Sequence, residues 1–189
     1  VDGVYTTDPN LCSTARKLDR VTYEEMLEMA SMGAKVLQIR SVEFAKKYNV
    51  PVHVRSTFSD DPGTLVAQED AMMEAVLVSG IAYDMVDMII QTASREGVTD
   101  MTFTVSRKDL EKAIQLMKEI VARIGGTGVE HDPYVAKVSV IGVGMRNHTG
   151  VATKAFAALQ QENINIQMIS TSEIKISCLI DEKYTELAV

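Results

Sequence analysis

The sequence predicts a mixed α/β fold (α+β), in which the end of an α/β domain is followed by two related small units. Residues 137–189 contain one complete unit, because their apolar pattern changes from strand to loop, helix, strand, strand and the beginning of a helix. An incomplete copy lies upstream: Val86–Ile90 matches Ile166–Ser170, and residues 101–114 match residues 176–189. Near the start of the chain, two helices that lead into a strand indicate the end of an α/β domain.

The composition predicts a globular chain and excludes several classes of function. The 189 residues are 46% apolar and carry a formal net charge of −7, with a pI near 5.0. There is no basic field for nucleic acid and no run of 18 apolar residues, so we expect neither a nucleic-acid partner nor a membrane span. Cys12 and Cys178 lack the spacing of metal ligands. We therefore expect reduced thiols, a cytoplasmic location and no metal site.

Two features of the first 66 residues suggest contact with a polar ligand. Residues 1–9 form a polar turn that contains a glycine, two threonine hydroxyls and a carboxylate beside a proline. An ordinary surface turn capped by Asp8 would explain the same residues. Lys35 follows Gly33 at a predicted helix end, where its ammonium could reach a phosphate. A solvated lysine is the alternative interpretation.

The helices and the strand of this part have local signals. Thr22 and Glu25 form a Thr-x-x-Glu capping box, which predicts a helix that begins there. Ser41 is predicted to cap a short helix over residues 42–48. Residues 50–55 are predicted to form the following strand. These elements are expected to pack together as the last part of an α/β domain.

The middle of the chain is predicted to contain a linker and the helix of the first unit. A turn is predicted at residues 59–63, and the polar stretch at residues 68–70 begins the linker. The stretch from Glu74 to Tyr83 is a candidate strand. The helix is predicted to start at a capping pattern formed by Ser106 and Asp109, and to end before Gly125. Its single apolar stripe is expected to face the core.

The second unit has the clearest alternation of all. Residues 137–143 form a strand, and a glycine-bounded polar loop follows up to Gly150. A helix is predicted to begin at Val151. Two strands follow, over residues 164–168 and 174–180, before a final helix.

The first unit lacks a counterpart of the strand, loop and helix found at residues 137–161 of the second. We therefore expect roughly 25 to 35 residues, about the length of that counterpart, to be missing between Asp84 and Met85. The chain then divides into the end of an α/β domain at residues 1–66, a linker and strand at 67–84, an incomplete first unit at 85–135 and a second unit at 136–189.

Four stretches together resemble a known family: Val1–Pro9, Thr22–Ala30, Gly33–Glu43 and Ser170–Ser177. They resemble aspartate kinase of the shorter, monofunctional type with two C-terminal ACT domains, and the likeness covers essentially the whole chain. The resemblance implies that residues 1–66 are the end of an amino-acid kinase domain. It also implies that the two units are ferredoxin-like βαββαβ ACT domains, one inserted within the other, which bind amino acids. The linker strand would then pair in the second unit.

The resemblance implies transfer of the γ-phosphoryl group of ATP, bound with Mg²⁺, to the side-chain carboxylate of L-aspartate. The product, 4-phospho-L-aspartate, serves lysine, threonine and methionine synthesis. No catalytic residue is expected in this chain, because the N-terminal loop and the aspartate-binding residues of the kinase domain are not in it. The family commonly has Arg where this chain has Asn10. The ATP-binding residues implied by the motif are Tyr5, Thr6, Thr7, Asp8, Pro9, Asn10 and Lys35.

The resemblance also implies feedback inhibition by lysine, threonine or both, bound at the ACT domains. Free N–H groups after Gly150 can hold an effector carboxylate, and acidic side chains can pair with its ammonium. Solvent-facing strand positions are the alternative for Asn165 and Gln91, and His148 is expected to be a loop histidine, not a metal ligand. The implied effector-binding residues are Asp87, Gln91, Ser94, Val151, Ala152, Asn165, Ile166, Ser172 and Glu173.

A regulatory subunit that binds amino acids without chemistry is the competing interpretation. The kinase-like residues 1–66, and a first residue, Val1, that is not Met, favour a piece of a whole kinase. We also expect a homodimer or a higher oligomer formed through the ACT domains. An unpaired edge strand as apolar as residues 164–169 would otherwise favour aggregation.

Overall fold

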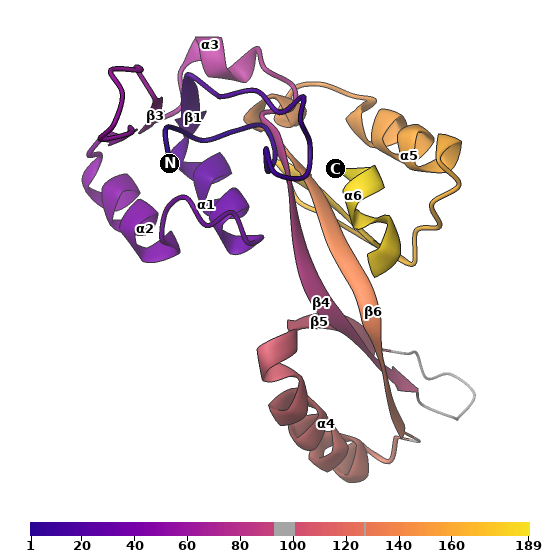
Figure 1. Ribbon diagram of the computed structural model, residues 1–189. Helices are drawn as coiled ribbons and strands as arrows, with labels where there is room; N and C mark the ends of the chain where they lie inside the picture. Colours follow the sequence, from indigo (N-terminus) through magenta and orange to yellow (C-terminus); the bar gives the residue numbers. More distant parts are fainter. Residues whose placement is uncertain (93–100, 127) are drawn as a thin grey trace.

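The computed structural model describes residues 1–92, 101–126 and 128–189. It consists of an upper body and a smaller lower lobe (Figure 1). Two long strands, β4 (Gly80–Thr92) and β6 (Gly128–Ile141), run from the body into the lobe and connect them. The kinase-like part and the second unit form the body, and the first unit forms the lobe.

A three-stranded sheet organises the kinase-like part. Its order is β1-β3-β2, from β1 (Arg20–Thr22), β3 (Thr64–Ala67) and β2 (Val52–Val54). Strand β3 pairs parallel with β1 and antiparallel with β2. Helices α1 (Tyr23–Ser31) and α2 (Ile39–Tyr48) pack against this sheet through a core of buried aliphatic and methionine side chains.

The start of α1 confirms the predicted capping box. The Thr22 hydroxyl accepts a hydrogen bond from Glu25 N at 3.1 Å, and Thr22 N donates to Glu25 Oε2 at 3.0 Å. The predicted cap of α2 is wrong. Gln38 is the N-cap, without a side-chain hydrogen bond, and Ser41 lies in the first turn. The N–H groups of Ser41 and Val42 both donate to the carbonyl oxygen of Gln38, so the helix begins about one turn earlier than expected.

The linker contains a short helix where the sequence pattern suggested the start of a strand. Asp70 accepts hydrogen bonds from Met72 N and Met73 N and thereby caps α3 (Ala71–Glu74). Strand β4 begins only at Gly80, so the predicted strand from Glu74 is wrong in its first half. The intervening residues 75–79 pack against the loop after β6.

One antiparallel sheet, in the order β5-β4-β6-β8-β7, serves both ACT-like units. The upper halves of β4 and β6 pair with each other and lead to β8 (Lys175–Asp181) and the edge strand β7 (Met168–Thr171). The pairing of the linker strand in the second unit is thus confirmed. Asp84 and Met85 are consecutive residues of β4, opposite Lys137 and Ala136.

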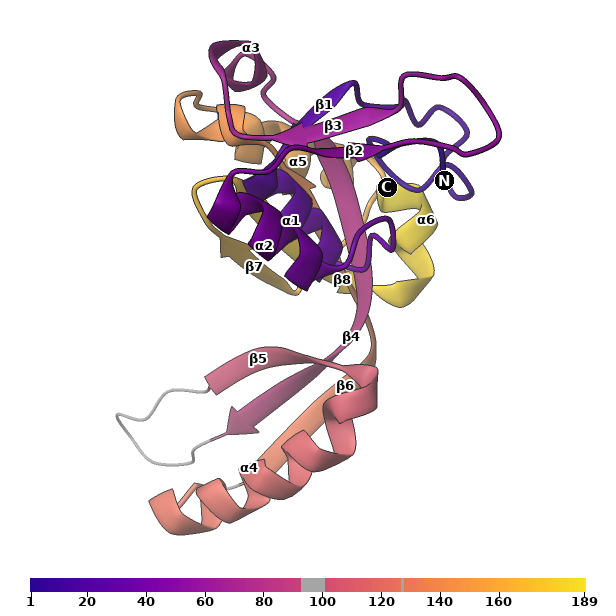
Figure 2. The same ribbon diagram turned by 90° about the vertical axis from the view of Figure 1, so that its left-hand side faces the viewer.

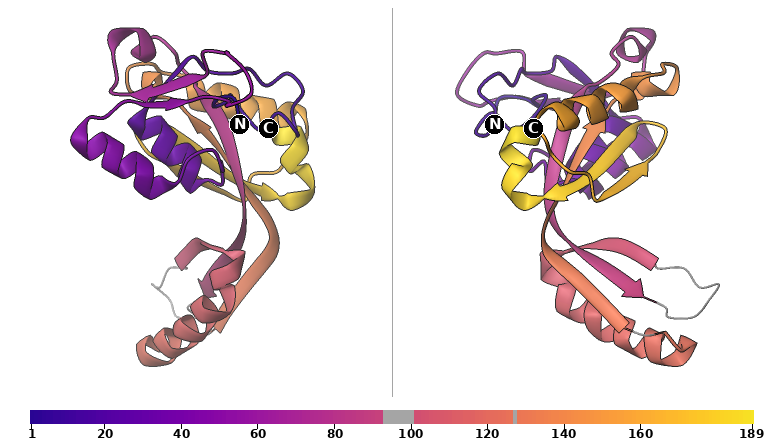
Figure 3. Two further views of the ribbon diagram at one scale, coloured as in Figure 1. Left: turned by 60° about the vertical axis from the view of Figure 1, so that its left-hand side comes forward. Right: turned by 90° about the vertical axis from the view of Figure 1, so that its right-hand side faces the viewer.

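Helices cover both faces of the upper part of this sheet (Figures 2 and 3). On one face, α5 (Val151–Gln161) and α6 (Thr185–Ala188) pack on Val138, Cys178 and Ile180. On the other face, α1 packs on Ala82 and Ile141. The kinase-like part and the second unit therefore share a core.

Strand β7 begins later than the alternation predicted, at Met168 instead of Ile164. Ile164 is buried, and its N–H donates to the carbonyl oxygen of Leu159 in α5 at 2.9 Å. That hydrogen bond ends the helix, so the backbone of Ile164 is used there and not in the sheet. A short 3₁₀ turn, η3 (Glu182–Tyr184), leads from β8 into α6.

The lower lobe contains α4 (Leu110–Ile124), which the 3₁₀ turn η1 (Arg107–Asp109) connects to β5 (Met101–Ser106). Met117 and Val121 are buried in the lobe, and Gly125 ends the helix at a φ of +72°. In the ranges that the structure covers, no helix is both long and apolar enough to cross a membrane.

Candidate functional site

The first candidate site is the loop between β6 and α5, residues 142–150, which we call the glycine loop. Gly150 is the N-cap of α5 and has a φ of +89°, a conformation that favours glycine. No side chain caps this helix, and its first turn has no acidic residue. The backbone N–H groups of the half-buried Val151 and Ala152 are thus free to bind an anion.

The first half of the glycine loop is held in a compact shape. Val143–Arg146 forms a 3₁₀ turn, η2. His148 Nδ1 donates a hydrogen bond to the carbonyl oxygen of Gly144 at 2.8 Å. Within the described part of the chain, no group of three or more His, Cys, Asp or Glu side chains is placed to hold a metal ion. His148 therefore supports the loop itself.

A shallow hollow of about 530 Å³ opens beside the glycine loop and is lined by Met145, Arg146, Ser172 and Glu173. Arg146 Nη1 lies 2.8 Å from Glu69 Oε2 in the linker, and Arg146 Nε lies 3.6 Å from Glu173 Oε2. A cation and a carboxylate thus face one hollow, as the two charged ends of a free amino acid require. The sequence reasoning missed Arg146, although an arginine inside a glycine-bounded loop is a signal for anion binding.

The remaining residues expected from the second unit lie elsewhere. Asn165 is exposed, and Ile166 is half-buried against the core under α5. Both follow the C-terminal end of α5, whereas Val151 begins it. The helix has 11 residues, so its two ends are about 16 Å apart at 1.5 Å per residue. One chain therefore does not bring Asn165 to the glycine loop.

The effector-binding residues expected from the first unit lie on or beyond the lower half of β4. Asp87 pairs in register with Val105 of β5, and Gln91 pairs with Met101. Ser94 lies outside the described residues. The strand register puts Val86 opposite Val135, and about 20 Å of β6 separates that position from the glycine loop at 3.3 Å per residue. Among the described residues of one chain, the two sets of expected effector residues therefore lie apart.

The second candidate site is the turn at residues 5–10, which we call the nucleotide loop. Thr6 N donates to the carbonyl oxygen of Arg16 at 2.8 Å, and Arg16 N donates to Thr6 Oγ1 at 3.0 Å. These two hydrogen bonds hold the loop to the next segment of the chain. Thr7 Oγ1 is buried and has no hydrogen-bond partner among the described residues.

The end of the nucleotide loop is closed on itself. Asp8 Oδ1 accepts hydrogen bonds from Asn10 N and Asn10 Nδ2, both at 2.9 Å. Pro9 and Asn10 are exposed. The Asn10 amide is therefore engaged with Asp8, in the position where the family commonly has an arginine.

Tyr5 belongs to a small charged cluster at the start of the chain. Its hydroxyl donates to Asp2 Oδ2 at 3.0 Å, and Lys17 Nζ donates to the same oxygen at 3.2 Å. The hydrogen bond from Tyr5, followed by that from Lys17, lowers the pKa of Asp2. The bond to Asp2 raises the pKa of Tyr5. Tyr5 thus stays a neutral donor and fixes the beginning of the nucleotide loop.

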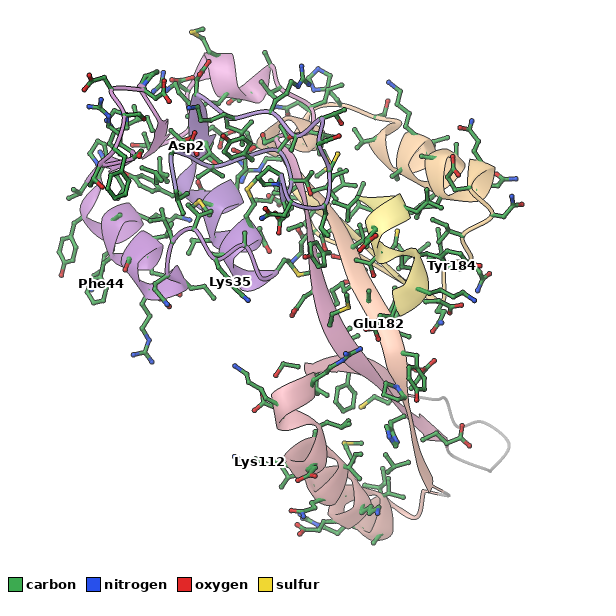
Figure 4. All side chains as sticks on the ribbon, in the orientation of Figure 1. Asp2, Lys35, Phe44, Lys112, Glu182 and Tyr184 are labelled. Carbon is green, nitrogen blue, oxygen red and sulfur yellow. The ribbon has the colours of Figure 1, made fainter. Side chains whose placement is uncertain are left out.

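Lys35 is exposed and lies after the C-terminal end of α1 (Figure 4). Figure 4 shows it well separated from Asp2, near which the nucleotide loop begins. The preceding turn needs Gly33, which has a φ of +91°. The structure therefore does not place Lys35 in the cluster formed by Asp2, Tyr5 and Lys17.

Two family models match the chain, one at each end. Residues 1–56 match the amino acid kinase family, and residues 138–189 match the ACT domain. The first range contains α1, α2, β1 and β2, and the second contains the glycine loop, α5, β7, β8 and α6. Both candidate sites thus fall within recognised domains.

A curated relative matches the chain over its whole length. The aspartokinase of Pseudomonas aeruginosa is 49% identical, and the match covers 100% of this chain and 54% of the relative. It extends over 221 positions, 32 more than the 189 residues of this chain. The chain spans about half the length of the curated relatives it matches.

Solved structures of aspartate kinases are similar to this chain as well. The aspartate kinase of Clostridium acetobutylicum is 26% identical with a TM-score of 0.87, over 100% of this chain and 51% of that one. E. coli aspartokinase III, in complex with lysine and aspartate, is 25% identical with a TM-score of 0.73, over 100% and 48%. A chain from the structure of aspartokinase alpha and beta subunits is 42% identical with a TM-score of 0.54, over 59% and 93%. The chain therefore belongs to the aspartate kinase family.

Proposed function

We propose that this chain is the regulatory half of an aspartate kinase together with the last part of its catalytic domain. The complete enzyme transfers the γ-phosphoryl group of Mg²⁺-bound ATP to the side-chain carboxylate of L-aspartate and forms 4-phospho-L-aspartate. The observation that carries this proposal is the 49% identity to an aspartokinase along the entire chain. In such a reaction the protein acts mainly by positioning the reactants and neutralising charge.

In this proposal the nucleotide loop contributes to the ATP site. The unpaired hydroxyl of Thr7 and the tight turn closed by Asp8 support a role in nucleotide contact. Asn10 supplies no cation, so a phosphate contact at that position needs another residue. Lys35 remains a candidate for the phosphates once the rest of the kinase domain is present.

The test is an assay of the complete kinase that contains this chain. We expect ADP release from ATP only when L-aspartate is present, and an acyl phosphate product that hydroxylamine traps. Residues 1–189 alone should show no turnover, because they contain no catalytic residue of the family. Release of ADP that does not depend on aspartate would contradict the proposed activity.

We further propose that lysine, threonine or both regulate the enzyme from the hollow beside the glycine loop. The effector carboxylate binds the N–H groups of Val151 and Ala152 together with Arg146, and its ammonium binds Glu173. The charges that face the hollow support this arrangement. A solved relative was crystallised with lysine.

Replacing Ser172 with phenylalanine is expected to fill this hollow and weaken inhibition. Ser172 lines the hollow and is exposed, so the substitution should not disturb the core. The concentration of effector for half-inhibition should rise about 5- to 150-fold, while the Michaelis constants for ATP and aspartate stay within about twofold. Ser59→Phe, in an exposed loop of the kinase-like part, is the matched control. Full inhibition of Ser172→Phe would exclude this hollow as the effector site.

A second copy of the chain would explain the positions of Asn165 and the edge strand. Strand β7 has an unpaired edge, and Ile169 is 49% exposed. Two copies side by side in opposite directions would place Asn165 of one chain near the glycine loop of the other. We expect a dimer or a higher oligomer in sedimentation at micromolar concentration, and we expect Asn165→Ala to weaken inhibition. A monomer with effector bound would contradict this arrangement.

A regulatory subunit without catalysis is the second candidate function. The match to the alpha and beta subunit structure, which covers 93% of that chain, favours it. The match of residues 1–56 to the amino acid kinase family favours the enzyme. The activity assay above separates the two.

A further inference from the structure

Glu25 is a buried carboxylate that joins three segments distant in the sequence. Its side chain is 1% exposed and accepts four hydrogen bonds. Oε2 accepts from the N–H and the hydroxyl of Thr22, both at 3.0 Å, within the capping box. Oε1 accepts from Ser79 Oγ at 2.5 Å and from Val143 N at 2.9 Å. The capping box needs only one oxygen, so the other is available to hold the linker and the glycine loop.

The linker side of this contact leads directly to the nucleotide loop. Two residues beyond Ser79, Ile81 N donates to the carbonyl oxygen of Thr6 at 2.7 Å. Gly80 lies between Ser79 and Ile81, and a Cβ added to it would lie 2.8 Å from the carbonyl oxygen of Thr6. The backbones of the linker and of the nucleotide loop are therefore in contact. Ser79 is therefore separated by one residue, Gly80, from the hydrogen bond to the nucleotide loop.

The other side of the contact is the start of the glycine loop. Val143 is fully buried and begins η2, the turn that carries Arg146 into the hollow. Gly142 and Gly144 flank Val143 and pack closely against the linker backbone. A Cβ added to Gly142 would lie 2.4 Å from a linker carbonyl oxygen, and one added to Gly144 would lie 2.3 Å from another. The backbone on both sides of Val143 is therefore packed tightly against the linker.

We propose that Glu25 is a positioning residue that couples the glycine loop to the nucleotide loop, so that effector binding alters nucleotide binding through the carboxylate. The coupling path runs from Val143 to Glu25, Ser79, Ile81 and Thr6. The proposal deepens the regulation described above and rests on the proposed function. Coupling of this kind is reciprocal, so nucleotide must change effector affinity by the same factor.

Glu28 provides a matched control on the same helix. Its carboxylate is 2.6 Å from Lys175 Nζ, so it also joins α1 to the second unit. Both side chains of this pair are about one-quarter exposed. Among the described residues, neither side chain forms a hydrogen bond or an ion pair with the glycine loop or the linker strand. Loss of the Glu28 pair should weaken the interface without interrupting the path through Glu25.

The decisive experiment compares Glu25→Gln, Ser79→Ala and Glu28→Gln in the complete kinase. A glutamine keeps the size of Glu25 but offers one acceptor oxygen to four donors. Lysine and threonine, alone and together, are titrated by calorimetry with and without ADP. The KM for ATP is measured with and without each amino acid.

We expect the effector affinity measured without ADP to stay within about threefold of wild type in all variants. The coupling factor, by which effector and nucleotide change each other's binding affinity, should fall about tenfold in Glu25→Gln and less in Ser79→Ala. Glu28→Gln should keep the wild-type factor. An unchanged factor in Glu25→Gln, or an equal loss in Glu28→Gln, would overturn the proposal.

Amide hydrogen exchange without effector gives a second and independent readout. Glu25→Gln should increase exchange at Val143, whose acceptor is weakened because four donors then compete for one oxygen. It should also increase exchange at Ile81, whose acceptor is the carbonyl oxygen of Thr6. Glu28→Gln should increase neither. Faster exchange at Val143 alone would mean that the contact ends at the glycine loop, and would overturn the coupling. If the wild type has no kinase activity, the proposed function is wrong. The exchange rate at Ile81 still tests whether Glu25 couples the glycine loop to the nucleotide loop.

Discussion

Replacing Glu25 with alanine is expected to lower the free energy of unfolding by about 3–5 kcal/mol. The carboxylate is buried and accepts hydrogen bonds from Ser79 Oγ and Val143 N, 54 and 118 residues away in sequence. Alanine leaves both donors buried without an acceptor, and each such group costs about 1–3 kcal/mol. It also removes half of the capping box, which costs about 1 kcal/mol.

Urea denaturation of the wild type and the variant, followed by circular dichroism, measures this loss. Glu28→Ala is the control, because its pair with Lys175 is partly exposed and an exposed ion pair contributes about 1 kcal/mol or less. The loss of unfolding free energy in Ser79→Ala should lie between those of Glu25→Ala and Glu28→Ala, since this variant removes one of the four donors to Glu25. Equal losses in Glu25→Ala and Glu28→Ala would show that the buried hydrogen bonds contribute little.

Glu25 also shows which contacts a local sequence pattern predicts and which it does not. Its spacing from Thr22 predicts the capping box, and the structure contains it. The contacts of its other oxygen with Ser79 and Val143 depend on how the linker and the glycine loop fold back on α1, which no local pattern encodes. The same limit explains two errors at element ends. Ser41 is a good cap by type, yet α2 starts earlier, and Ile164 alternates like a strand residue, yet it bonds to α5.

The candidate site was predictable where a motif is local. The glycine-bounded loop and the uncapped start of α5 follow from residue types and spacing, whereas Ser172 was implied by the resemblance alone. Arg146 carried a local signal too, but its ion pair with Glu173, which lies 27 positions later, depends on the β7–β8 turn and could not be predicted. Asn165 and Val151 are close in sequence, but the whole of α5 separates them. The resemblance implied one effector site that includes both residues, whereas within one chain they lie at opposite ends of α5.

Replacing Gly144 with alanine is expected to destabilise the protein by about 3 kcal/mol, at the upper end of what overpacking costs. A Cβ at this position would lie 2.3 Å from the carbonyl oxygen of Val76 and 2.8 Å from that of Glu74. Both are backbone atoms, so no side-chain rotation relieves the clash, and either the linker or the glycine loop must move. The φ of Gly144 is not among the positive values, so the cost is steric and not conformational.

Because Val143 precedes this glycine, the same displacement should separate its N–H from Glu25. It should also move η2, which carries Arg146, out of place at the hollow and so weaken effector binding together with stability. Gly128→Ala is the matched control, because no atom of the described residues lies within 4 Å of a Cβ added there and the φ of Gly128 is not positive. We expect that variant to stay within about 0.5 kcal/mol of wild type. Urea denaturation and calorimetric titration with lysine and threonine measure both effects. If Gly144→Ala kept wild-type stability, the linker would have to be mobile enough to yield to a methyl group, and a rigid connection from the glycine loop through Val143 to Glu25 could not hold.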